Sequence, residues 1–191
     1  MLTKESREKI DREIAKYPPE HKQSAVMAAL HIAQDEHGWL SVTLMDHIAE
    51  LLGMRPIQVY EVASFYTMYD LEPVGRHKVS VCTNISCLLR GSDDIVAHLK
   101  KRLGIGFNET TPDGRFTLKE VECLAACGGA PMFQIGKSYY ENLTPDRIDE
   151  ILAGLEKSWR TRSVFGTCIA IGHGRSTSTK AMAAIRHGDV S

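Results

Sequence analysis

Four clustered cysteines are the residues of this sequence best suited to chemistry. They are Cys82, Cys87, Cys123 and Cys127. The first two form a C-x4-C motif and the last two a C-x3-C motif, and each motif begins at or just after the end of a predicted β-strand. If these strands are neighbours in one sheet, their ends bring four thiolates together. Two thiolates for each tetrahedral iron are what a 2Fe-2S cluster requires.

Other interpretations of these cysteines stay open from the spacing alone. Zinc also binds four thiolates, but its usual C-x2-C motif is absent from this sequence. Redox dithiols use that same C-x2-C spacing, and buried cysteines can serve packing only. Small residues beside the motifs, such as Gly91, Gly128 and Gly129, let backbone N–H groups approach the sulfurs, which favours the cluster. The fifth cysteine, Cys168, is predicted to be a free thiol without a ligand role.

Hydrophobic periodicity divides the chain into three predicted domains. Residues 1–70 have apolar residues at helical spacing in four short segments, which predicts a helical bundle. Residues 71–157 predict the order β-α-β-β-β-α, with strands over His77–Cys82 and Phe116–Val121, and so a mixed sheet with helices in the α+β or α/β class. Residues 158–191 are basic and rich in glycine, serine and threonine, and we expect a flexible tail.

Composition limits the classes of function. The formal net charge of −1 gives no global attraction to nucleic acid, and no apolar run is long enough for direct membrane insertion. No secretory signal is visible at the N-terminus, and an odd number of cysteines, four of them clustered, suits a reducing compartment. The sequence has neither a dinucleotide-binding G-x-G-x-x-G motif nor a P-loop. We therefore expect no complete active site on this chain, and a role in accepting and passing one electron.

Five segments of the chain resemble a known family. They are Ala63–Met68, Val81–Cys87, Thr111–Phe116, Val121–Pro131 and Tyr139–Pro145. Together they resemble the small 2Fe-2S subunit of the NADH-oxidising module of respiratory complex I, whose relatives serve NAD-linked formate dehydrogenases and hydrogenases. The resemblance extends from about residue 4 to residue 157 in family order.

The resemblance implies a helical bundle followed by a thioredoxin-like 2Fe-2S ferredoxin domain, with the four clustered cysteines as ligands of one cluster. It also implies a flavoprotein partner subunit that binds NADH and FMN. The implied function is that of an electron-transfer subunit of an NADH:quinone oxidoreductase. The implied location is cytoplasmic and peripheral to the inner membrane, or the matrix side in mitochondria. The alternatives are the equivalent subunit of a formate dehydrogenase or hydrogenase, a stand-alone thioredoxin-like ferredoxin, and a zinc-binding adaptor.

Three local features lead to further expectations. Ala125 stands where the family commonly has glycine, and a positive φ there would cost alanine about 1 kcal/mol. The Ala130–Pro131 bond is predicted to be cis, as is common at such a place in thioredoxin-like folds. The segment Phe65–Tyr69 is either core or a docking surface for the flavoprotein, with its aromatic residues and Met68 as candidate anchors.

Overall fold

The computed structural model describes residues 1–162, with side chains to residue 157. Residues Met1–Glu150 form one compact unit, and the chain divides after Glu150. The predicted domain boundaries after residues 70 and 157 stay predictions, and Cys168 lies outside the described residues. Among the helices that are described, none is both long and apolar enough to cross a membrane.

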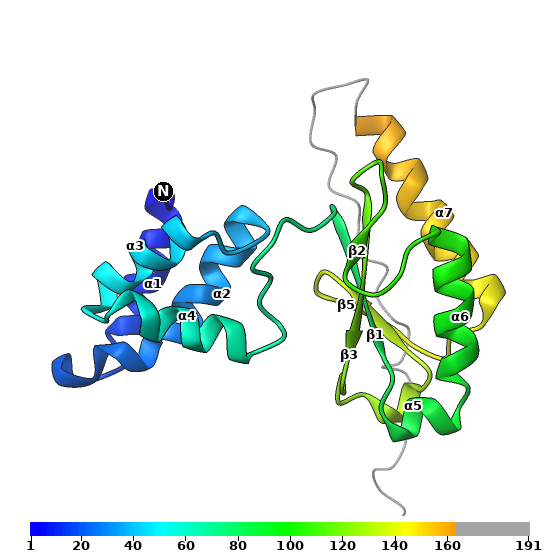
Figure 1. Ribbon diagram of the computed structural model, residues 1–191, viewed down its shortest axis with the longest axis horizontal. Helices are drawn as coiled ribbons and strands as arrows, with labels where there is room; N and C mark the ends of the chain where they lie inside the picture. The colour runs from blue at the N-terminus through cyan, green and yellow to red at the C-terminus, as the bar shows by residue number, and fades with distance from the viewer. Residues whose placement is uncertain (163–191) are drawn as a thin grey trace, which may run out of the picture. The chain divides into compact units, whose positions relative to one another are not determined.

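The first part of the chain is helical, as predicted (Figure 1). Its elements are α1 (Lys4–Ile14), the 3-10 helix η1 (Pro19–Ala25), α2 (Val26–His37), α3 (Val42–Leu52) and α4 (Pro56–Phe65). Ser41 caps α3, because its Oγ accepts a hydrogen bond from the backbone N–H of Leu44 at 3.2 Å. Gly53 ends the same helix in the left-handed conformation.

A hydrophobic core lies entirely within this helical part. It joins all four α-helices through fully buried side chains, among them Ile10, Leu30, Ile48, Leu52 and Val59. Burial of each such side chain stabilises the fold by about 1.5–3 kcal/mol before the entropy cost of ordering the chain. Isolated helices of this length are only marginally stable in water, so tertiary packing is what stabilises them here.

The second part of the chain contains a five-stranded mixed sheet with the order β2-β3-β1-β4-β5. The strands are β1 (His77–Cys82), β2 (Glu109–Thr110), β3 (Phe116–Val121), β4 (Phe133–Ile135) and β5 (Ser138–Tyr140). Only the β1–β3 pair is parallel, with Cys82 opposite Val121 in register, and the other pairs are antiparallel. The predicted class, helices with a mixed sheet, is confirmed.

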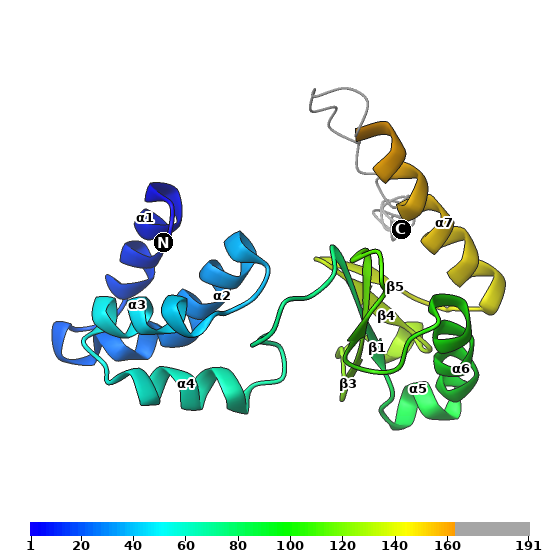
Figure 2. The same cartoon turned by 45° about the horizontal axis from the view of Figure 1, so that its top comes forward.

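Helices accompany the sheet. They are α5 (Ile85–Leu89), α6 (Ser92–Leu103), the 3-10 turn η2 (Cys127–Gly129) and α7 (Pro145–Arg162). Figure 2 shows α5 and α6 on the same side of the sheet. The sequence patterns predicted α6 and the start of α7 but missed α5 and β2. Five and two residues respectively are too short to display a period.

The segment between the helical part and β1 is anchored by polar contacts to β1 and β3. The Asp70 carboxylate is 2% exposed and contacts two ammonium groups, that of Lys78 on β1 and that of Lys119 on β3, the latter at 2.5 Å. Further along, the Gly75 N–H donates to Thr117 Oγ1 on β3 at 2.6 Å. Residues 70–76 therefore lie against the polar side of this strand pair.

We expect Asp70→Asn to lower the free energy of unfolding by about 2–3 kcal/mol. The substitution removes the negative charge between two half-buried ammonium groups and leaves them facing each other. Urea denaturation of the full chain measures the change.

Asp35→Asn is the matched control, because Asp35 pairs with Lys137 at 2.7 Å through side chains that are 45% and 79% exposed. Such a surface pair contributes less than about 1 kcal/mol. Equal losses in the two variants would contradict a special contribution from the buried carboxylate.

Candidate metal centre

The first cysteine pair is buried at the end of the central strand. Cys82 is the last residue of β1, and its backbone N–H donates to the Met132 carbonyl at 3.1 Å. Its thiol donates to the Glu122 carbonyl at 3.8 Å, which directs the side chain toward the loop after β3. Cys87 lies in α5, a helix capped by Asn84, whose side chain accepts from the Ile85 N–H. The short helix thus places the Cys87 thiol beside the Cys82 thiol.

Cys82 and Cys87 contact each other in an apolar environment. Only 2% and 1% of their surfaces are exposed, and Ala130 and Met132 belong to the same buried cluster. Burial, together with the hydrogen bond and charge of Cys82, raises the pKa of Cys87 to about 11. The Cys87 thiol therefore keeps its proton at neutral pH unless a positively charged group displaces that proton. Binding a metal supplies such a group.

The second cysteine pair lies in an exposed loop after β3. Cys123 Sγ accepts a hydrogen bond from the Ala125 N–H at 3.3 Å. Ala125 has a φ of +56°, the positive value that the sequence analysis considered at this position. Cys127 begins η2, and its charge also raises the pKa of Cys87, which places it within electrostatic range of the buried pair.

The donor set fits a 2Fe-2S cluster in its chemistry. Four free thiols lie at the ends of two paired parallel strands, and the predicted pairing of those strands is confirmed. Within residues 1–157, no group of three or more Cys, His, Asp or Glu side chains stands ready-made to hold a metal ion. The contacts join Cys82 to Cys87, whereas Cys123 is exposed. The ligand role of all four residues stays a prediction.

A neighbouring segment supports the second cysteine loop. The Asn142 N–H donates to the Gly129 carbonyl at 2.7 Å, and the Leu143 N–H donates to the Pro131 carbonyl at 3.0 Å. The Ala130–Pro131 bond is cis, as predicted. Glu141 lies directly against Gly129, a contact that no local sequence pattern predicts because the residues are distant in the chain.

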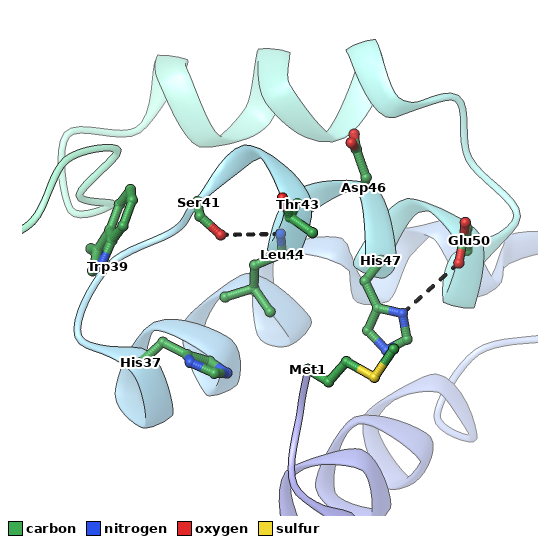
Figure 3. A pocket seen from close by; sticks show the side chains of 9 residues that line it. All are labelled: Met1, His37, Trp39, Ser41, Thr43, Leu44, Asp46, His47 and Glu50. Carbon is green, nitrogen blue, oxygen red and sulfur yellow. Dashed lines mark hydrogen bonds and ion pairs between the residues drawn. The ribbon is translucent and has the colours of Figure 1, made fainter.

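A cavity of about 430 Å³ lies in the helical part, away from the cysteines (Figure 3). Trp39 and Ser41 line it near the start of α3. His47 also lines it and pairs with Glu50 at 3.9 Å. None of its lining residues is a cysteine. The cavity therefore adds no sulfur donor to the candidate centre.

Comparisons with known proteins agree with this architecture. The family model described as "Thioredoxin-like [2Fe-2S] ferredoxin" matches residues 10–156. A protein of Rhizobium meliloti (strain 1021), named as one of the subunits of NADH-quinone oxidoreductase, is 46% identical over 158 residues, which cover 83% of this chain and 93% of the relative. "NADH dehydrogenase [ubiquinone] flavoprotein 2, mitochondrial" of Dictyostelium discoideum is 48% identical over 162 residues, covering 84% of this chain and 66% of that protein.

A solved structure shares the fold. It is an NAD⁺-reducing [NiFe]-hydrogenase in the air-oxidized state, with a TM-score of 0.62 and 20% sequence identity. The match covers 74% of this chain, which spans about a quarter (24%) of that hydrogenase chain. At this identity the likeness concerns the fold alone.

We expect Ala125→Gly to raise the free energy of unfolding of the cluster-free chain by about 0.5–1 kcal/mol. Glycine adopts the positive φ without the Cβ clash that alanine has there, although it also gains entropy in the unfolded chain. Ala126→Gly in the same loop is the control. Ala126 has a φ of −119°, so glycine relieves no clash there and we expect no gain. Equal effects in both variants would contradict strain at Ala125.

Proposed function

Because this chain belongs to the thioredoxin-like [2Fe-2S] ferredoxin family, we propose that it is the electron-transfer subunit of an NADH:quinone oxidoreductase of the complex I type. Its cofactor is one 2Fe-2S cluster, which takes up and releases one electron when bound. The observation that most supports this role is the pairing of β1 with β3, which brings both cysteine motifs to one end of the sheet.

We assign the cluster ligands to Cys82, Cys87, Cys123 and Cys127. The buried pair excludes water from one side of the site, while the loop pair provides two accessible thiols. The Ala125 N–H already donates to Cys123 Sγ, and such a hydrogen bond stabilises negative charge on the sulfur. The chain thus contributes four thiol ligands, an apolar side that excludes water, and one oriented N–H group.

The experiment that tests the ligand assignment is substitution of each cysteine by alanine. The purified unsubstituted chain is expected to be brown, to contain two irons and two acid-labile sulfides, and to give an EPR signal after reduction. Each substitution at the four assigned positions is expected to reduce the iron content by most of its value, because no spare thiol lies in either motif.

Cys168→Ala is the matched control, and it is expected to retain the cluster. A colourless chain with one zinc ion would instead support the zinc-binding alternative. Loss of iron in the control variant would show that the ligand assignment is incomplete.

The equivalent subunit of an NAD-linked formate dehydrogenase or hydrogenase is the second candidate. The hydrogenase structure supports it at the level of fold. The curated relatives at 46–48% identity carry the names of NADH dehydrogenases that reduce quinones, which is the reason for preferring complex I. Purification from the source with its partners separates the two, since one assembly reduces quinone and the other contains molybdenum or nickel.

The proposed partner is the flavoprotein subunit that binds NADH and FMN. The sequence contains no G-x-G-x-x-G motif for a dinucleotide, so the oxidation of NADH falls to another subunit. We place the assembly on the cytoplasmic face of the inner membrane, or on the matrix side in mitochondria. The chain is peripheral there, held by its partner.

An apolar surface on the helical part fits this partner. We call it the α4 patch, and it consists of Ile57, Tyr60, Phe65, Tyr66 and Met68, whose side chains are all exposed. The opposite face of α4 packs into the core through Val59 and Ala63. The patch therefore adds nothing to the core, and its aromatic residues are of the types that anchor interfaces. Tyr69 is not part of it, because it is buried and donates to the Met27 carbonyl.

We expect Phe65→Ser to weaken binding to the flavoprotein at least tenfold. Phe65 is 77% exposed, so its loss leaves the fold intact while removing a large apolar anchor. Tyr17→Ser, a 40% exposed aromatic residue before η1, is the control. The dissociation constants of the purified subunits provide the measurement. Unchanged affinity in the Phe65 variant would refute docking by the α4 patch.

A further inference from the structure

Glu141 folds its side chain over the second cysteine loop. A Cβ atom built on Gly129 would lie 2.5 Å from Cδ and 2.6 Å from Cβ of Glu141, closer than any real Cβ approaches another atom. Gly129 is buried, and it is the last residue of η2, which Cys127 begins. Glycine is therefore needed here so that an acidic side chain can rest on the loop backbone.

The backbone holds Glu141 in this place from both sides. Immediately before it, Tyr140 ends β5, where it pairs with Phe133. Immediately after it, the Asn142 N–H donates to the Gly129 carbonyl. The side chain thus starts from a fixed point against the loop, although Glu141 itself is exposed to solvent.

We propose that Glu141 is a potential-setting residue, whose carboxylate makes the cluster harder to reduce. Gly129 follows Cys127 by two residues in η2, which is an advance of about 4 Å along a 3-10 axis. The Glu141 carboxylate, which lies against Gly129, therefore stands close to Cys127. Reduction adds one negative charge to the cluster, and a neighbouring negative charge opposes it. This inference rests on the proposed function, since it presumes a cluster on Cys127.

Among the hydrogen bonds and ion pairs described for residues 1–157, none involves the Glu141 carboxylate. Its effect is therefore electrostatic and acts through the solvent-exposed side of the loop. An interaction of this kind weakens as added salt shortens the screening length, from about 30 Å at 0.01 M to about 10 Å at 0.1 M. A purely structural role of Glu141 would show no such dependence.

Glu141→Gln and Glu141→Lys in the full chain test the proposal. Redox titration followed by EPR should show the equilibrium constant for cluster reduction raised about threefold to tenfold by glutamine. Tenfold corresponds to 59 mV for one electron. Lysine should shift the potential further in the same direction, and both shifts should shrink as salt is added.

Glu20→Gln, an exposed acidic residue in η1, is the control and should leave the potential unchanged. Iron and sulfide contents are measured first in every variant. Full cluster content with an unchanged potential in both Glu141 variants would overturn this inference and leave the proposed function standing. Absence of the cluster from the unsubstituted chain would overturn both. A shift that does not respond to salt would assign Glu141 a structural role and overturn the electrostatic one.

Discussion

The parallel pairing of β1 with β3 is the constraint on which the candidate site depends. Parallel strands end at the same edge of a sheet, so the register that sets Cys82 opposite Val121 also sets the start of both cysteine loops. A shift of the register by one residue would turn Cys82 to the other face of the strand and separate it from Cys87. Buried valines at positions 79 and 81 oppose such a shift, because it would expose both.

The two faces of this strand pair have different partners. Val79, Val81 and Leu118 form an apolar face, whereas Lys78 and Lys119 point to the other face. On that second face the buried Asp70 carboxylate forms ion pairs with both ammonium groups. Cys82 shares its strand face with Lys78, since they are separated by an even number of residues. The anchored segment therefore lies on the face of β1 that carries Lys78, while the cysteine site begins at the end of the strand, where Cys82 is its last residue.

Much of this arrangement follows from local sequence signals. Alternation predicted β1 and β3 with their observed bounds, and apolar residues at helical spacing predicted four short helical segments in residues 1–70. Burial in the segment after α4 could not be predicted, because it depends on tertiary packing. Of its residues, Tyr69 reaches the core while Tyr66 and Met68 do not.

The candidate site was predictable in its residue types but not in its detail. Cysteine spacing identified four donors, yet it could not show that one pair is buried and the other exposed. The family resemblance raised the question of a positive φ at Ala125, but an alanine alone does not predict it, and only the structure shows it. The contact of Glu141 with Gly129 joins residues from different elements, and its signal exists only in three dimensions.

The central position of β1 has a consequence for how the centre comes together. A strand with neighbours on both sides opens only in large unfolding events, so its amides exchange slowly with solvent. Cys82 ends this strand, whereas Cys123 and Cys127 are exposed and lie outside the sheet, in the loop after β3. The site is thus divided between a half that is built into the central strand and a half that lies on an exposed loop. In the metal-free protein, the two buried thiols of Cys82 and Cys87 are already side by side, and the thiols of Cys123 and Cys127 complete the donor set from the loop.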